Sequence, residues 1–145
     1  MYCNSELALP TVADNCGVVS NQYNIPSGSV FSVGVNVIAG IAQEANGNTA
    51  SCGLVITVKD GENPQLTCPG PISVSTDLLS CDAVVNYALP TATDNYGVDT
   101  NQYDTHSGTK FSKGVSTVTG TATDSAGNSA NCASTVTVTD AEVLT

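Results

Sequence analysis

The sequence predicts an all-β protein made of two β-sandwiches in series. Three observations indicate this fold class: a repeat covers most of the chain, long stretches alternate with a period of two, and no stretch shows convincing helical periodicity. The density of Val, Thr and Gly also argues against helices. With 145 residues the chain is long enough for two small domains. We expect about six or seven short strands in each.

The internal repeat has a constant offset of 80 residues. Residues 9–60 align without a gap on residues 89–140, and 25 of the 52 aligned pairs are identical. Ahead of the aligned region the second copy has 25 residues, 64–88, whereas the first copy has only eight. We therefore expect two modules, residues 1–60 and residues 61–145. The first should lack its N-terminal strand, and the second should be complete.

The strands are predicted from the second copy. Short β-branched or aromatic stretches occupy residues 71–75, 83–87 and 98–103. Residues 115–123 place Val115 and four threonines on one face and Ser116, Val118, Gly120 and Ala122 on the other, which is the period of a strand. A turn at 124–127, where glycine supplies positive φ, leads to a returning strand at 130–139. The hairpin between these two strands should recur in the first copy.

Composition excludes several classes of function. Three lysines and no arginine stand against thirteen acids, giving a net charge of −10. So few cations cannot neutralise many phosphates, which excludes a typical nucleic-acid binder and disfavours an anionic membrane surface. No apolar run reaches the roughly 20 residues needed to cross a bilayer, and no secretion signal opens the chain, so we expect any signal to have been removed or to lie upstream. A polar surface of Ser, Thr, Asn and Gly suits an extracellular, secreted or cell-surface β-protein.

An ordered series of motifs resembles the hyalin repeat, or HYR module. In the second copy these motifs are Cys68-Pro69, Val84-Val85-Asn86-Tyr87, Pro90-Thr91-Ala92-Thr93-Asp94-Asn95, Ser107-Gly108-Thr109-Lys110-Phe111, Gly114-Val115, Ala122-Thr123-Asp124-Ser125-Ala126-Gly127-Asn128 and Cys132. The first copy keeps the pattern over residues 9–60. Two departures stand out: the first copy lacks the opening Cys-Pro strand, and Tyr96 replaces the cysteine expected after Asp94-Asn95.

This resemblance implies an immunoglobulin-like or fibronectin-like β-sandwich, found in tandem in secreted and cell-surface proteins with structural or adhesion roles. It carries over no catalytic residues, and we expect a structural or adhesion module rather than an enzyme, with other extracellular matrix or surface proteins as partners. The single histidine, His106, lies beside Ser107 in a loop, where adjacent side chains point apart and no nucleophile elbow is recognisable. Glycan binding through Tyr23 and Tyr103 is a further alternative.

One disulfide follows from strand direction. If strands alternate up and down as in an immunoglobulin-like sandwich, Cys68 at the first strand and Cys132 at the last strand lie at the same pole. We expect these two to be bonded. Cys52 corresponds to Cys132 in the first copy, and its natural partner would belong to the absent strand.

The remaining cysteines leave their pairing open. We expect Cys3 and Cys81 to hold equivalent positions ahead of the second strand of each copy. Cys16 can be paired on paper with Cys3 or with Cys52. The alternatives are that all bonds lie within the chain and staple small cores, or that an unpaired cysteine bonds a neighbouring chain.

The absent strand motivates a second hypothesis, a self-assembling filament subunit. A sandwich without its first strand exposes a sheet edge, which a strand from another molecule can complete. The donor would be the tail at residues 141–145 or a segment preceding Tyr2 in a neighbouring protomer. Repeated head to tail, this contact does not close and gives a fibre. The alternative is that the boundary of the sequence creates the gap.

Five oxygen-bearing residues near the junction of the modules are candidate metal ligands. They are Asp60, Glu62, Asn63, Asp94 and Asp124. Hard oxygen ligands suit Ca²⁺, which takes six to eight of them. No contiguous calcium loop is present, and these residues also suit turns. We therefore expect no cofactor, with Ca²⁺ as the one alternative.

Overall fold

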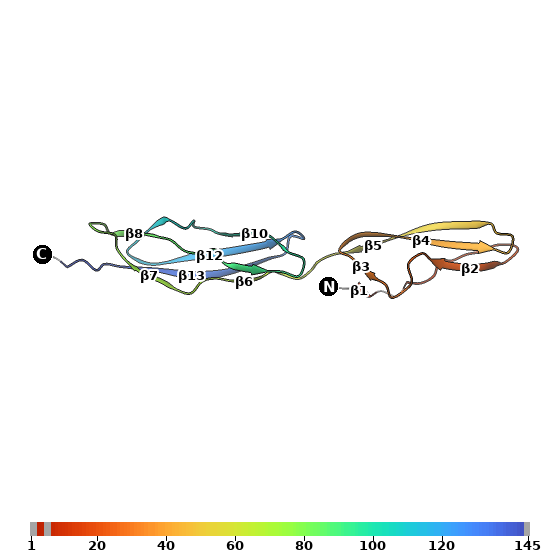
Figure 1. Cartoon of the computed structure of the whole chain (residues 1–145), viewed down its shortest axis with the longest axis horizontal. Helices are drawn as coiled ribbons and strands as arrows, with labels where there is room; N and C mark the ends of the chain where they lie inside the picture. The colour runs from red at the N-terminus through yellow and green to blue at the C-terminus, as the bar shows by residue number, and fades with distance from the viewer. Residues whose placement is uncertain (1–2, 5–6, 144–145) are drawn as a thin grey trace. The chain divides into compact units, whose positions relative to one another are not determined.

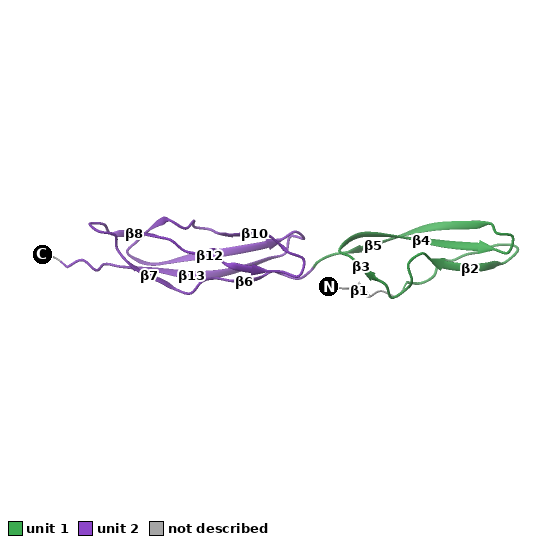
Figure 2. Ribbon diagram, viewed as in Figure 1, with its two compact units in different colours: residues 1–60 green, residues 61–145 purple. Residues whose placement is uncertain are grey.

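The structure is a computed structural model that describes residues 3–4 and 7–143. Within these residues every regular element is a β-strand (Figure 1). The chain divides into two compact units, Met1–Asp60 and Gly61–Thr145, called unit 1 and unit 2 below (Figure 2). A search of the described residues finds no helix that is long and apolar enough to span a membrane.

Unit 2 is a two-layered β-sandwich. Its strands are β6 (Gln65–Thr67), β7 (Ile72–Ser75), β8 (Asp82–Val85), β9 (Thr91–Thr93), β10 (Val98–Tyr103), β11 (Thr109–Ser112), β12 (Gly114–Asp124) and β13 (Ser129–Thr139). One sheet has the order β10-β12-β13-β7, in which only the β13–β7 pair is parallel. Two separate antiparallel pairs, β8–β11 and β6–β9, complete the unit.

The core of unit 2 follows from the period-two pattern. Inward positions of β12 and β13 carry Val118, Val136 and Val138, which are almost completely buried. They pack with Val85 and Phe111 from the opposite layer. Burying such side chains stabilises the fold by about 1.5–3 kcal/mol each, so this cluster is a main source of the stability of unit 2.

Unit 1 repeats part of this architecture. Its strands are β1 (Cys3–Asn4), β2 (Val18–Tyr23), β3 (Val30–Phe31), β4 (Gly34–Glu44) and β5 (Thr49–Val58). They form the sheet β2-β4-β5 and the antiparallel pair β1–β3. The hairpin register is the same as in unit 2, because Gly40 pairs with Cys52 as Gly120 pairs with Cys132. The buried cluster of unit 1 is smaller and consists of Phe31, Ile38 and Val58.

Identical residues of the repeat make identical hydrogen bonds. Asn21 Nδ2 donates to the carbonyl oxygen of Pro10 at 2.7 Å, and Asn101 Nδ2 donates to that of Pro90 at 2.6 Å. Each bond attaches the segment that contains the proline to the sheet strand that contains the asparagine, β2 or β10. Local features of the module are therefore the same in both units.

The strand prediction needs two corrections. In its described residues unit 2 has eight strands rather than six or seven, because Pro69 and Pro71 separate β6 from β7. Unit 1 lacks more than the one strand that was predicted to be missing. Its described residues contain no strand equivalent to β6, β7 or β9 of unit 2. Residues 11–13 align with β9 but form no strand, since β9 exists only through its pairing with β6.

Candidate functional sites

A disulfide closes one edge of unit 2. Cys68 and Cys132 are bonded, with their Cα atoms 5.6 Å apart, and they connect the end of β6 to β13. The sulfurs pack against Gly120 on β12, where an added Cβ would lie 3.2 Å from Cys132 Sγ and 3.3 Å from Cys68 Sγ. It would also lie only 2.7 Å from Pro90 Cγ. Glycine is needed at this position because the disulfide and the proline fill the space above it.

In unit 1 the free thiol of Cys52 has surroundings similar to those of the bonded Cys132 sulfur in unit 2. An added Cβ on Gly40 would lie 2.9 Å from Cys52 Sγ and 2.8 Å from Pro10 Cγ. Cys52 is exposed and forms no disulfide. The sulfur of Cys52 therefore packs on its glycine as that of Cys132 does.

Two further cysteines are also thiols. Cys16 and Cys81 are exposed and unbonded, so neither pairing suggested for Cys16 is formed in the structure. The proposed equivalence of Cys3 and Cys81 is wrong. The backbone of Cys3 lies in β1 opposite Phe31. In unit 2 the residue opposite the aligned Phe111 is Ala83, so Cys3 corresponds to Ala83, two residues beyond Cys81. The side chain of Cys3 is outside the described residues.

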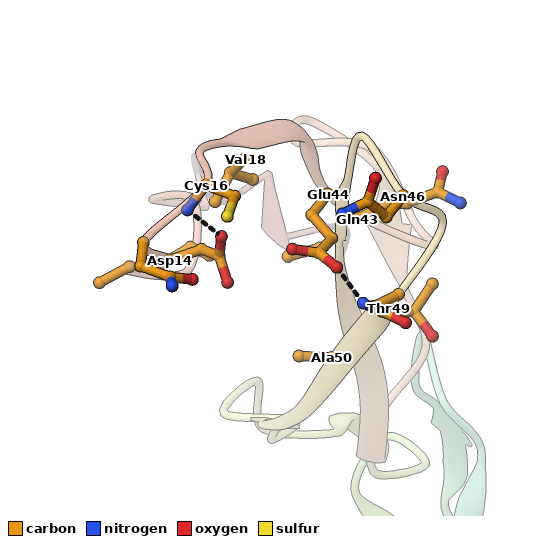
Figure 3. Close-up of a pocket in the computed structure, with 13 residues that line it drawn as sticks. Asp14, Cys16, Val18, Gln43, Glu44, Asn46, Thr49 and Ala50 are labelled. Carbon is orange, nitrogen blue, oxygen red and sulfur yellow. Dashed lines mark hydrogen bonds between the residues drawn. The ribbon is translucent and has the colours of Figure 1, made fainter.

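A groove runs along unit 1 beside Cys52. It consists of two adjoining hollows of about 230 Å³ and about 430 Å³ that share the lining residues Val12, Ala13, Ala42 and Ala50. Cys52 lines the smaller hollow. The larger one is shown in Figure 3, with Asp14 and Cys16 on one side and Glu44, Thr49 and Ala50 on the other.

The equivalent place in unit 2 is filled by polypeptide. There β6 pairs with β9, with Leu66 opposite Ala92, and Cys68 is bonded to Cys132. By the offset of 80, Ala92 corresponds to Val12 and Cys132 to Cys52, and both of these line the smaller hollow of unit 1. The groove of unit 1 is therefore the position that β6 and Cys68 occupy in unit 2.

The predicted metal ligands come together only in part. Asp60 is the last residue of unit 1, and within unit 2 the carboxylate oxygens of Asp94 and Asp124 lie within 4.8 Å of each other. Asp124 is buried, which would raise the pKa of its carboxyl, but hydrogen bonds from Asn128, Ala126 Nα–H and Gly127 Nα–H outweigh this effect and lower the pKa. Hard oxygen donors suit a divalent cation, and the calcium site stays a prediction.

Glu62 and Asn63 are not part of this cluster. Glu62 accepts a hydrogen bond from Asn95 Nδ2 at 2.9 Å. Together with Asp94, both residues line a separate hollow of about 230 Å³ within unit 2. The backbone around Asp94 is fixed by its Oδ1, which accepts a 2.8 Å hydrogen bond from Tyr96 N. This bond alone gives Asp94 a structural role as a turn former.

The remaining candidates take part in loop and core packing. Ser107 Oγ accepts a 2.9 Å hydrogen bond from Tyr87 N, so it serves to hold a loop next to His106. Tyr103 is buried, and its ring packs edge-on against Tyr87 at 5.1 Å between centroids. Tyr23 packs against the core of unit 1. Tyr23 is only half-buried, and glycan binding through these tyrosines stays a prediction.

The outward side of the unit 1 hairpin is apolar, a feature that the sequence analysis missed. We call this the apolar face. It consists of Val35 (70% exposed), Val37 (66%), Ile41 (41%) and Val55 (61%). The aligned residues of unit 2 are Val115, Thr117, Thr121 and Thr135. Comparison of outward positions between the two copies would have revealed the face, since three threonines are replaced by valine or isoleucine.

Known proteins share both modules. The sequence profile of the HYR domain matches residues 6–58 and residues 59–138. Hyalin of Strongylocentrotus purpuratus is 34% identical over 90% of this chain, and hyalin of Lytechinus variegatus is 32% identical over 89%. The chain spans 11% and 25% of these two relatives, respectively. A Rattus norvegicus protein, sushi, von Willebrand factor type A, EGF and pentraxin domain-containing protein 1, is 38% identical over 58% of the chain and 2% of its own length.

Proposed function

Because this chain belongs to the HYR domain family, we propose that it is a structural and adhesive segment of an extracellular repeat protein, and that copies adhere through the apolar face of unit 1. HYR modules are not a family of enzymes, and the relatives are proteins in which the chain corresponds to a small part. We therefore expect the function of this chain to depend on interactions that its surface makes.

The apolar face is the observation that carries this proposal. Val37 on β4 and Val55 on β5 are directly paired across the hairpin, so their exposed side chains lie next to each other. Val35 and Ile41 extend the same side of β4. Contiguous exposed apolar residues with a polar surround are typical of protein interaction sites. The net charge of −10 opposes self-association, and physiological salt screens that repulsion beyond about 8 Å.

Aggregation of protein-coated beads tests the adhesion proposal. The variant Val37→Thr/Val55→Thr gives unit 1 the residues that unit 2 has at these positions, so it should fold and should reduce bead aggregation severalfold. The matched control Thr117→Val/Thr135→Val gives unit 2 an apolar pair and should increase aggregation. Equal aggregation of the three proteins at physiological salt would exclude adhesion through this face.

Filament assembly by strand donation is a second candidate function, favoured by the groove beside β5. Residues 141–143 are exposed and outside any strand, whereas residues 144–145 of the suggested donor tail lie outside the described residues. Sedimentation velocity over a range of concentrations tests assembly. A particle of monomer mass at every concentration would count against the filament.

A further inference from the structure

We infer that the apolar face of unit 1 forms a two-fold symmetric contact with the same face of a second copy of this chain. In this contact a dip at Ala39 and Gly53 on each copy receives two valine side chains of the other copy. The inference rests on the proposed adhesion, because it names what the apolar face contacts. It goes further in giving Gly53 a role in the specificity of that contact.

Gly53 is the observation that carries the inference. The strands β2, β4 and β5 contain three glycines. Gly34 has a φ of 115°, and Gly40 has Pro10 and Cys52 packed against it. Gly53 lies in the middle of β5 without a positive φ, and an added Cβ there would meet nothing within 4 Å. Because glycine weakens the interior of a strand, neither the backbone nor the packing of this chain accounts for Gly53.

The surroundings of Gly53 form a dip in the outward side of the hairpin. Glycine inside a strand often marks a place that another backbone or a ligand approaches closely. The residue opposite Gly53 is Ala39, so this pair presents a single methyl group to the outside. In unit 2 the aligned pair is Thr119 and Ala133, whose side chains fill the same place. We call the Ala39 and Gly53 pair the dip.

Larger side chains stand on both sides of the dip. Outward residues of a strand follow one another at about 6.8 Å, and each pair across the hairpin makes one row. Val37 and Val55 form the row on one side of the dip, called the valine row. Ile41 and Ser51 form the row on the other side, and Val35 belongs to the row beyond the valines. The order along β4 is therefore Val35, valine row, dip and Ile41.

This order is complementary to itself under two-fold symmetry. The axis lies between the two faces, at right angles to the strands and midway between the valine row and the dip. It places the valine row of each copy over the dip of the other, and Val35 of each copy over Ile41 of the other. Packed sheets lie about 10 Å apart with interdigitating side chains, so a row of large residues requires a row of small ones opposite. One contact thus covers all four residues of the apolar face.

The surroundings of the face in unit 1 carry fewer charges than those in unit 2. The strands β2, β4 and β5 contain one charged residue, Glu44, which lines the larger hollow. Val19 on β2 is aligned with Asp99 of unit 2. Asn24, whose Oδ1 accepts a 3.0 Å hydrogen bond from the backbone N–H of the dip alanine, is aligned with Asp104. In a chain with a net charge of −10, the loss of two carboxylates beside this face lowers the repulsion between approaching copies.

The size of the sheet predicts a weak contact. From strand spacing and rise, the sheet β2-β4-β5 measures about 15 Å by about 35 Å, which is less than the roughly 800 Å² per partner of a standard stable interface. The dimer should therefore form in solution only at high concentration. Many weak contacts between two coated surfaces add up to firm adhesion.

Gly53→Val separates the dip from a general effect of apolar area. Valine suits a strand and its side chain has open space here, so the variant should fold at least as well as the wild type. If apolar area alone drove association, the variant would associate more tightly. Because valine fills the dip, we expect the dissociation constant of the dimer to rise about tenfold or more, since two-fold symmetry places the substitution in the contact twice.

Sedimentation equilibrium of the full chain up to millimolar concentration measures this change, after alkylation of the exposed thiols to prevent disulfide-linked dimers. The matched control Ala133→Val alters the aligned position of unit 2 and should leave the dissociation constant unchanged. A second variant, Ala39→Thr/Gly53→Ala, gives the dip the residues of unit 2 and should weaken the dimer as well. Thermal unfolding at low concentration shows whether each monomer is folded.

A monomer–dimer equilibrium that Gly53→Val weakens and Ala133→Val leaves unchanged supports the inference. A wild type that stays monomeric at millimolar concentration, or a Gly53→Val variant that associates as tightly as the wild type, would overturn it. Species larger than a dimer would also overturn it, because this two-fold contact closes at two copies. If Val37→Thr/Val55→Thr lowers bead aggregation while Gly53→Val raises it, adhesion through the apolar face stands and the two-fold contact alone is excluded.

Discussion

The two units have the same hairpin but differ in what covers its last strand. In unit 2, β13 is flanked by β7 and bonded through Cys132 to Cys68, and seven described residues form its buried cluster. In unit 1, β5 has β4 as its only neighbour in the described sheet, and the cluster has three residues. The turns and hairpin registers are local and persist without the covering segment. Closing the core requires contacts between residues far apart in the sequence, and it depends on the covering segment.

Removing the disulfide should make unit 2 resemble unit 1, and it is the largest effect that we expect. Cys68 and Cys132 are separated by 64 residues, and the loop-entropy relation for this length gives a loss of about 4 kcal/mol in the free energy of unfolding. Hydrogen exchange of Cys132→Ser, read unit by unit, should show lowered protection in unit 2 and unchanged protection in unit 1. The control is Cys81→Ser, which removes an exposed thiol. A fall in both units would mean that they do not unfold independently.

The paired glycines test whether the sulfur packing is the same in both units. Gly120→Ala places a methyl group 2.7 Å from Pro90 Cγ and against two bonded sulfurs, and overpacking of this kind costs about 1–3 kcal/mol. Gly40→Ala should cost less, because the Cys52 thiol can rotate away while the disulfide cannot. Thermal unfolding of both variants measures the difference. Equal losses would indicate that the prolines, and not the sulfurs, limit the space.

A smaller contrast is expected for the aligned core residues Val136 and Ile56. Val136→Ala creates a cavity beneath β7 and should cost about 2 kcal/mol. Ile56→Ala removes more carbon, but from a half-buried site, and should cost about 1 kcal/mol. Denaturant titrations give both values. If Ile56→Ala were the more costly substitution, β5 would have to be covered in solution, which would itself indicate an occupied groove.

Sequence reasoning was most reliable where structure is local. The hairpin strands followed from the alternation of residues 115–123 and from the turn at 124–127, and the strand at 98–103 was placed to the residue. Short strands such as β6 and β9 could not be predicted, because three residues form a strand only through a distant partner. For the same reason the sequence indicated the groove in unit 1 only as a missing strand and did not identify its lining residues.

If the acidic cluster binds Ca²⁺, the ion should stabilise unit 2 and leave the stability of unit 1 unchanged. Module sites of millimolar to submillimolar affinity would stabilise unit 2 by about 0.5–1.5 kcal/mol at about 1 mM Ca²⁺. Differential scanning calorimetry with and without a chelator measures this change. Asp94→Asn should remove the effect, and its counterpart in unit 1, Asp14→Asn, should not. A melting temperature that is the same in Ca²⁺ and in chelator would rule out the site.

The smallest expected difference concerns the acid stability of unit 2. Hydrogen bonding from Ser80, aided by Lys110 at 3.3 Å, lowers the pKa of Asp82 below its usual value of 3.8. Because the unfolded chain then binds more protons, this contribution is complete above pH 3.8 and is lost as the pH falls through the folded pKa. Unit 1 has Val30 in place of Lys110.

Urea unfolding of unit 2 between neutral pH and about pH 2 measures this loss. Asp82→Asn should flatten the profile in acid, and Ser80→Ala should flatten it more than Lys110→Val, because the serine hydrogen bond is the larger cause. Added salt should weaken the lysine contribution, since both side chains are partly exposed. Superimposable profiles for wild type and Asp82→Asn would show that the pair contributes nothing, and the acid sensitivity of unit 2 would then have to come from its more buried carboxylates.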